Sequence, residues 1–245
     1  AVTTFSFVHS TRELTCGVGS AARLSELVKQ RDVQSAALIL DPAFIGGPIE
    51  ARITALLRDA GTTTTVIPGP RTEPDLAAVE SCSTALATAD PDLIAVIGGG
   101  SAMDCAKVAR ILLSNPGPIL NLASPMGVPM APHSSLFVAL PTTAGTGSEV
   151  SESAVIHNPA ASYKAIFRSP EMTPAVAILD AELAAGAPPG VTAASGYDAV
   201  THAVEAYTSK ASNPVTDALA ERAMALLAGA LERSFTNGAD LSARN

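Results

Sequence analysis

The chain has 245 residues, of which 47% are hydrophobic, 16% charged and 4% aromatic, and 15 Lys and Arg against 23 Asp and Glu give it a formal net charge of −8. This composition excludes a disordered tail, and the length allows one large domain or one domain with part of another. The acidic balance argues against nucleic acid and anionic membranes as partners, and no apolar run is long enough to span a membrane. The three cysteines include no C-x-x-C pair, which argues against a disulfide-stabilised scaffold. A reducing, cytoplasmic setting is expected.

Through the first two thirds of the chain, short apolar or β-branched runs alternate with helical patterns. The predicted strands are 3–8, 14–18, 36–40, 62–67, 93–97 and 136–140, and the predicted helices are 20–30, 48–59, 74–88 and 101–113. Pro74 is expected in the first turn of its helix, where a proline costs no hydrogen bond. Strands of four to six residues separated by such helices predict βαβ units and a parallel sheet.

The last third of the chain changes character. A proline-rich loop over 115–135 precedes the strand 136–140, and further short strands are expected at 154–157, 163–167 and 176–179. The segment Pro188-Pro189-Gly190 predicts a break in regular structure, and two long helices, 192–208 and 216–233, are predicted after it. We therefore predict a Rossmann-like α/β domain with a parallel sheet over residues 1–185 and the start of an all-α domain over residues 186–245.

Two glycine clusters compete as dinucleotide sites. Residues 17–22 fit G-x-G-x-x-G/A, and Asp41 follows at the end of a later strand. Together they satisfy the sequence fingerprint of a dinucleotide-binding site. The strand before that cluster is too polar for the centre of a sheet. Residues 98–101 (GGGS) follow the most apolar strand and open a helix, where unpaired amides and the helix dipole suit a pyrophosphate. The alternative for this second cluster is a tight turn without a ligand.

Two further patterns carry candidate chemistry. Residues 141–149 (PTTAGTGSE) follow a buried strand and are dense in hydroxyls and glycines, so they can offer donors to phosphate or ribose, or form an ordinary polar turn. Asp198 and His202 stand four positions apart on a predicted helix, so their side chains share one face. A carboxylate and an imidazole so placed are half of a divalent-metal site, or a simple surface contact.

Three motifs occur in one order along the chain: GGGSAMDCAK at 98–107, PTTAGTGSE at 141–149 and GYDAVTHAVEAY at 196–207. Together they resemble the group III, or iron-dependent, alcohol dehydrogenases, and the similarity covers essentially the whole chain. The resemblance implies NAD-dependent, metal-assisted hydride transfer between a small alcohol and its aldehyde or ketone, by an enzyme that forms homo-oligomers such as dimers.

The resemblance also implies residue roles. Asp41 matches the acidic residue that binds the adenosine ribose and favours NAD over NADP, and Lys164 matches a lysine near the nicotinamide ribose. Asp198 and His202 match the first two ligands of the catalytic metal, Fe²⁺ or Zn²⁺. Gly69 departs from the family, because several relatives carry a cofactor-binding Asn there. The remaining matches are the pyrophosphate turn Gly98, Gly99, Gly100 and Ser101 and the cofactor-contacting hydroxyls of Thr142, Thr143 and Thr146.

The family completes its metal site with two histidines from later helices, and none of His9, His133 and His157 lies in a matching motif. We therefore expect the N-terminal portion of such an enzyme, whose last helices expose an apolar face. One alternative is a non-catalytic nucleotide-binding fragment. Another is a metal-free enzyme of the maleylacetate reductase type, which the presence of Asp198 and His202 disfavours. The sequence does not specify which alcohol or aldehyde is used.

Overall fold

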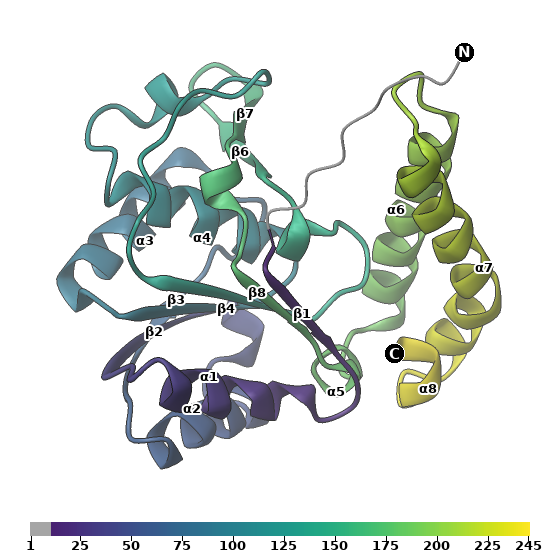
Figure 1. Ribbon diagram of the computed structural model, residues 1–245, viewed down its shortest axis with the longest axis horizontal. Coiled ribbons are helices and arrows are strands. Elements are labelled where there is room, and N and C mark those ends of the chain that lie inside the picture. Colours follow the sequence, from purple (N-terminus) through teal and green to yellow (C-terminus); the bar gives the residue numbers. More distant parts are fainter. Residues whose placement is uncertain (1–10) are drawn as a thin grey trace.

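The computed structural model describes residues 11–245, and its centre is a six-stranded parallel sheet (Figure 1). The strand order is β1-β8-β5-β4-β2-β3. This confirms the predicted parallel sheet; the expected strand 3–8 lies outside the described residues. The strands are β1 (Glu13–Cys16), β2 (Ser35–Leu40), β3 (Thr63–Pro68), β4 (Leu93–Gly98), β5 (Leu136–Pro141) and β8 (Val176–Leu179).

The position of each strand follows from its side chains. All six residues of β4 are buried, as expected of an apolar strand covered on both faces. β1 alternates between half-buried and exposed residues and lies at one edge of the sheet. This agrees with the prediction that the polar segment before the first glycine cluster is not a central strand.

Two helices cover each face of the sheet (Figure 1). α1 (Arg23–Gln30) and α2 (Pro48–Asp59) pack with one set of buried side chains that includes Leu24, Leu57 and Leu93, while α3 (Leu76–Ala89) and α4 (Gly100–Leu112) pack with a second set. Each core is therefore a layer between the sheet and a helix pair, as in doubly wound α/β proteins.

β6 (Ser153–Asn158) and β7 (Tyr163–Arg168) confirm two of the predicted strands, but they form a separate antiparallel pair outside the large sheet. Their residues alternate between buried and more accessible positions, because one face of the pair packs on the protein and the other does not. β6 lies against α4, so this pair covers the helix that begins at the triple glycine.

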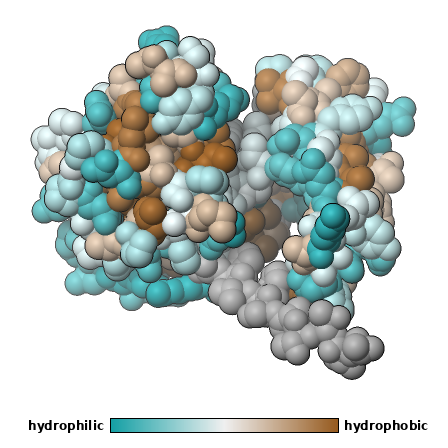
Figure 2. Space-filling view, turned by 90° about the horizontal axis from the view of Figure 1, so that it is seen from above, coloured by the Kyte–Doolittle hydropathy of each residue, from teal (hydrophilic) through white to brown (hydrophobic). Residues whose placement is uncertain are grey.

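The last part of the chain is helical: α5 (Ala181–Ala184), α6 (Pro189–Thr208), α7 (Pro214–Thr236) and α8 (Leu241–Arg244). α6 and α7 pack closely, since a Cβ at Gly196 would lie 2.2 Å from Leu231 Cδ1. Large apolar side chains such as Tyr197, Leu219 and Phe235 remain exposed, as the sequence predicted. Seen from above, the sheet part and the helical part stand as two lobes, and brown apolar side chains reach the surface of both (Figure 2).

Several predicted boundaries need correction. Pro74 is not in the first turn of a helix, because α3 begins at Leu76 and Asp75 caps it by accepting a bond from the Ala78 amide at 2.8 Å. The predicted helix 20–30 begins as a 3-10 turn, and the predicted loop 115–135 contains another 3-10 turn, η3 (Ile119–Leu122).

The two long helices begin at Pro189 and Pro214, earlier than predicted, since proline suits a first helical turn. The predicted domain boundary at 185–186 falls between α5 and α6 and stays a prediction. Among residues 11–245, no helix combines the length and the apolar character that a membrane span requires.

Candidate functional site

The glycine turn, residues 98–101, lies at the carboxyl edge of the sheet, where β4 ends and α4 begins. Gly99 is the N-cap residue of α4, and within the described chain no side chain caps this helix end. The first amides of a helix lack intrahelical partners and carry the positive end of its dipole. The turn can therefore accept an anionic group such as a pyrophosphate.

Close neighbours explain why this turn consists of glycines. A Cβ at Gly98 would lie 2.7 Å from the Cβ of Ala102, and a Cβ at Gly100 would lie 2.7 Å from Thr146 Cγ2. Both distances are far shorter than ordinary carbon contacts. A side chain at Gly98 or Gly100 is therefore excluded, and of the three glycines Gly98 is buried whereas Gly99 and Gly100 are half-buried.

The hydroxyl loop, residues 141–149, lies directly beside the glycine turn. The Thr142 amide donates to the Gly98 carbonyl at 3.0 Å. Thr143 Oγ1 lies 3.3 Å from the position that a Cβ on Gly99 would take. Thr146 is exposed and Thr143 half-buried, whereas Thr142 is buried, so Thr142 is the least accessible of the three predicted hydroxyls.

Asp41 follows β2, the neighbour of β4, and reaches the same place. Its amide donates to the Ile97 carbonyl at 2.9 Å, and its Cβ lies 3.1 Å from the position of a Cβ on Gly98. Its carboxylate accepts a bond from the Ala43 amide at 3.0 Å. Gly69, which departs from the family pattern, also borders the turn, because a Cβ there would lie 3.7 Å from the Cβ of Ala102. The structure thus brings the glycine turn, the hydroxyl loop and Asp41 together.

The backbone amides of the first glycine cluster, residues 17–22, bind a side chain of the protein itself. The buried carboxylate of Asp180 accepts bonds from the amides of Gly19 and Ala21, both at 3.0 Å, and from Arg52 Nη2 at 3.1 Å. These are the amides that a phosphate would need. The fingerprint at residues 17–22 is therefore a structural turn that caps itself on an internal carboxylate.

Lys164 lies on β7, outside the large sheet, and its ammonium forms an ion pair with the carboxylate of Glu73. Its side chain is 60% exposed. An exposed pair of this kind is weak. The lysine is therefore free to exchange this partner for another anion.

Asp198 and His202 lie on one face of α6, with Asp198 Oδ1 3.7 Å from His202 Nε2. Their side chains are 42% and 52% exposed, so both donor atoms are accessible. Across residues 11–245, no group of three or more His, Cys, Asp or Glu side chains is placed to hold a metal ion. The pair fits two positions of a metal site, and two donors alone do not make a complete one.

Sequence reasoning named Glu149 as a possible acid or base but did not single out Asp104 and Lys107, two polar residues beneath the site. Burial raises the pKa values of the Asp104 and Glu149 carboxyls and lowers the pKa of the Lys107 ammonium to about 8. Asp104 and Lys107 belong to the motif at 98–107, and a lysine between Ala106 and Val108 on a helix with many apolar residues is the signal that could have revealed them.

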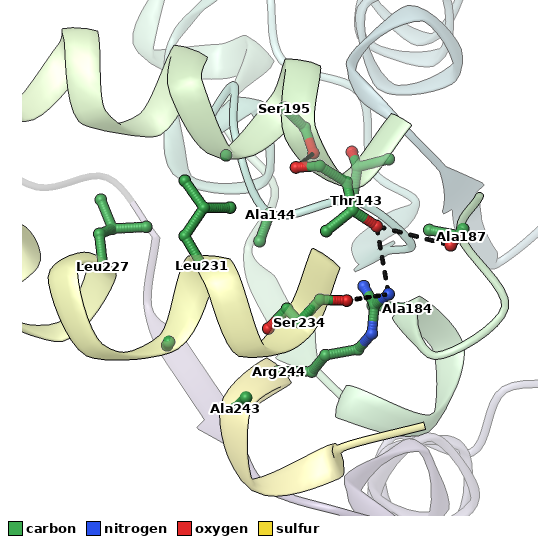
Figure 3. A pocket seen from close by; sticks show the side chains of 13 residues that line it. Thr143, Ala144, Ala184, Ala187, Ser195, Leu227, Leu231, Ser234, Ala243 and Arg244 are labelled. Carbon is green, nitrogen blue, oxygen red and sulfur yellow. Dashed lines mark hydrogen bonds between the residues drawn. The ribbon is translucent and has the colours of Figure 1, made fainter. Parts of the chain in front are cut away.

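A small cavity marks where the hydroxyl loop meets the helical lobe (Figure 3). Thr143, Ser195 and Leu231 contribute to its lining, as do Arg244 and Thr192, whose side chains are joined by a hydrogen bond of 3.1 Å from Arg244 to Thr192 Oγ1. Its volume of about 70 Å³ is far below the several hundred Å³ of a small-molecule pocket. This cavity is therefore packing space between the lobes.

The parallel sheet and its uncapped glycine turn define an α/β protein of the doubly wound, Rossmann-like class. Residues 11–181 match the family model of iron-containing alcohol dehydrogenases, and residues 192–245 match the model of the C-terminal part of the Fe-containing alcohol dehydrogenase family. The chain therefore belongs to the iron-containing alcohol dehydrogenase family.

Individual relatives agree with this assignment. A probable alcohol dehydrogenase, EutG, of Salmonella typhimurium is 35% identical over 94% of this chain and 58% of its own length. A 1,3-propanediol oxidoreductase structure superimposes with a TM-score of 0.90 at 32% identity, covering 99% of this chain and 63% of its own.

A sulfoacetaldehyde reductase from Bifidobacterium kashiwanohense, solved in complex with NAD⁺, gives a TM-score of 0.91 at 27% identity, over 99% of this chain and 63% of its own. The chain thus spans about three fifths of the length of these relatives.

Proposed function

We propose that the protein containing this chain transfers a hydride between a small alcohol and its aldehyde or ketone, with NAD as coenzyme and a divalent metal as Lewis acid. The observation that carries this proposal is the convergence of the glycine turn, the hydroxyl loop and Asp41 at one edge of the sheet. Membership of the iron-containing alcohol dehydrogenase family supports it. The cytoplasmic setting and self-association stay predictions.

The coenzyme is proposed to lie across the glycine turn. The amides of Gly99, Gly100 and Ser101 would bind its pyrophosphate, because they sit at an uncapped helix end. Thr143 and Thr146 offer hydroxyls beside them, with Thr142 beneath. Asp41 would accept bonds from the adenosine ribose, and its negative charge would repel a 2′-phosphate, which favours NAD over NADP.

Lys164 is proposed to contact the nicotinamide ribose after leaving Glu73. Little energy is lost in that exchange, since both partners of the pair are largely exposed. The lysine would then donate to ribose hydroxyls and help fix the nicotinamide end of the coenzyme.

Asp198 and His202 are proposed to supply two ligands to Fe²⁺ or Zn²⁺, whose preferred donors include carboxylate oxygen and imidazole nitrogen. The remaining metal ligands would come from other parts of the complete natural protein. A bound metal would supply Lewis-acid chemistry at the substrate oxygen, and a bound coenzyme would supply hydride transfer. Ser195 of α6 touches Gly145 of the hydroxyl loop, and Asp198 lies three positions further along the same helix, so α6 would hold the proposed ligands near the proposed coenzyme loop.

The test uses the complete natural protein, loaded with Fe²⁺ or Zn²⁺ and assayed for NADH formation from small alcohols. Asp198→Ala and His202→Ala are each expected to weaken metal binding at least tenfold and turnover at least 10³-fold, because each removes a ligand. NADH binding should stay within twofold, and NADPH should bind more weakly than NADH. Glu221→Ala, which removes an exposed carboxylate on α7, is the control. A wild-type protein that turns over no small alcohol or aldehyde contradicts the proposal.

A nucleotide-binding module without catalysis is the second candidate, favoured by the finding that residues 11–245 gather no group of three or more metal-ligating side chains. Calorimetric NADH binding without metal uptake or turnover would support it. A metal-free reductase is the third, and a near-normal rate in Asp198→Ala would favour it.

A further inference from the structure

Two oppositely charged side chains, the buried Lys107 and the half-buried Asp104, lie in the middle of α4, beneath the hydroxyl loop. Lys107 is fully buried, and its Nζ donates to Ser148 Oγ at 2.8 Å, to Ser151 Oγ at 3.1 Å and to the Ser153 carbonyl at 2.9 Å. These are three acceptors for the three protons of an ammonium group. The lysine is therefore satisfied only while residues 148–153 stay where they are.

Asp104 faces the same serine from one turn earlier in α4. Its Oδ1 accepts a bond from Ser148 Oγ at 2.6 Å, and its Oδ2 accepts one from the Val155 amide at 2.9 Å. Ser148 thus accepts from Lys107 and donates to Asp104. We call these three residues the buried bridge, because the buried hydroxyl of Ser148 joins the buried Lys107 cation to the half-buried Asp104 carboxylate.

The buried bridge continues to the glycine turn. The Ser148 amide donates to Thr146 Oγ1 at 3.2 Å, and Thr146 Cγ2 lies 2.7 Å from the place of a Cβ on Gly100. A chain of direct contacts therefore links the Lys107 ammonium to the turn. Since an unpaired buried charge is costly, any loop position that breaks the bridge is disfavoured.

We propose that Asp104, Lys107 and Ser148 are positioning residues that hold Thr146 and the hydroxyl loop against the glycine turn, and so set the affinity for the coenzyme. This inference rests on the proposed function, since it assigns the bridge to the same site. The three residues do not touch the coenzyme themselves. They determine how many of the loop's donors are in place before it arrives.

Arg110 provides a matched control on the same helix. It is also buried, but its guanidinium donates to the carbonyls of Glu171, His133 and Ser135 and stacks over the Phe137 ring at 5.4 Å. Its partners lie in the segments that precede β5 and β8, not in the hydroxyl loop. Removing Arg110 therefore tests the loss of a buried cation without loss of the loop contact.

The experiment compares Ser148→Ala, Lys107→Met, Ser151→Ala and Arg110→Met in the complete natural protein, with NADH emission, steady-state kinetics and urea unfolding as readouts. Ser148→Ala and Lys107→Met are expected to raise the NADH Kd and KM at least tenfold, while kcat at saturating NADH falls less than threefold. Ser151→Ala keeps Asp104, Lys107 and Ser148 but removes one of the three acceptors of Lys107, so it should raise the Kd less than Ser148→Ala does. Arg110→Met should lower stability comparably and leave Kd within twofold.

Hydrogen exchange of residues 141–149 completes the test, because it needs no ligand. The bridge variants should lose protection in this loop at least tenfold, and Arg110→Met should not. An unchanged NADH Kd in Ser148→Ala, an equal rise in Arg110→Met, or unchanged loop protection overturns the inference. Wild-type protein that binds no NADH contradicts the proposed function instead, and the exchange data still decide whether the bridge holds the loop.

Discussion

At the scale of single residues, the candidate site depends on the absence of side chains at three consecutive positions. Gly98, Gly99 and Gly100 carry no side chain, and Ala102, Thr143 and Thr146 approach the space that a Cβ would take. Since side chains are absent here, the amides of the half-buried Gly99 and Gly100 are the polar groups that the turn can offer to a ligand. A glycine at these positions thus permits close approach of the loop and of a ligand.

Gly100→Ala should therefore impair the turn. Its Cβ would meet Thr146 Cγ2 at 2.7 Å, so the hydroxyl loop must move outward, at about 1–3 kcal/mol. We expect the NADH Kd, followed by NADH emission, to rise about tenfold or more. Gly186→Ala is the control, since a Cβ there meets nothing within 4 Å. Equal NADH affinity in the two variants would mean that the turn does not bind the coenzyme.

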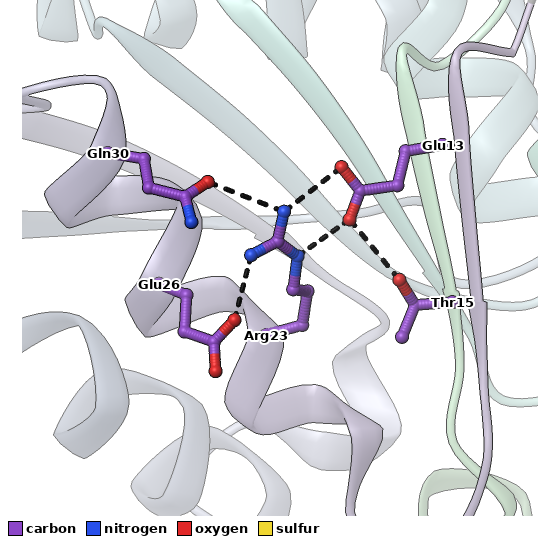
Figure 4. A network of polar contacts seen from close by, with 5 residues as sticks. All are labelled: Glu13, Thr15, Arg23, Glu26 and Gln30. Carbon is purple, nitrogen blue, oxygen red and sulfur yellow. Dashed lines mark hydrogen bonds and ion pairs between the residues drawn. The ribbon is translucent and has the colours of Figure 1, made fainter.

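At the scale of elements, the edge strand β1 is fixed to α1 by a polar network (Figure 4). Arg23 Nε donates to Glu13 Oε1 at 2.6 Å, and Arg23 Nη2 donates to Glu13 Oε2 at 3.2 Å. Arg23 also contacts Glu26 and Gln30 on its own helix. This two-pronged pair holds a short strand that, among residues 11–245, has a neighbour on one side only.

The network predicts a pH-dependent contribution to stability. The hydrogen bond from Arg23 lowers the pKa of the Glu13 carboxyl below its ordinary value of 4.5, so the unfolded chain binds more protons than the folded one just below that value. The stabilisation is therefore complete above about pH 5 and is lost as the pH falls through the lowered pKa.

Urea unfolding of wild type and Glu13→Gln should show this effect. We expect the wild type to have the higher midpoint at pH 6, by a few tenths of a molar at most because the pair is partly exposed. The difference should shrink toward pH 3. Asp59→Asn, which removes the exposed pair with Arg58, should give no such trend. A difference between wild type and Glu13→Gln that grows as the pH falls would contradict the assignment.

At the scale of the whole molecule, the sheet lobe and the helical lobe meet at the hydroxyl loop. A Cβ at Gly145 would lie 2.6 Å from the Ser195 carbonyl oxygen and 2.9 Å from Ser195 Cα. The contact is therefore backbone to backbone. It fixes the distance between the proposed coenzyme loop and the helix that carries Asp198 and His202.

Gly145→Ala tests this coupling. The added methyl group has no flexible neighbour to displace, so we expect α6 to shift and the free energy of unfolding to fall by about 1–3 kcal/mol. Turnover should fall about tenfold or more, with the NADH Kd within threefold, because the two reactants are separated while the turn stays intact. Gly229→Ala on α7, where a Cβ meets nothing within 4 Å, is the control. Unchanged turnover in Gly145→Ala would show that the lobes need not keep this spacing.

The sequence predicted much of this architecture because the signals were local. The apolar run of β4, the glycines after it and the alternation of strands with helices gave the parallel sheet and the position of the glycine turn. The start of α3 was predicted at Pro74 because a proline often occupies the first turn of a helix. An aspartate is also a common helix start, and in the structure Asp75 forms the cap. The roles of Asp41, Asp198 and His202 came from family resemblance and stay predictions.

The sequence by itself determined the element types, the parallel sheet and the glycine turn, because these follow from periodicity and backbone freedom within a few neighbouring residues. Tertiary structure alone decided that Asp180 fills the first glycine cluster, across 159 to 161 residues of chain, and that Lys107 and Asp104 meet through Ser148. Such contacts depend on which distant segments the folded core brings together. A local sequence pattern does not predict which residues far apart in the chain become neighbours.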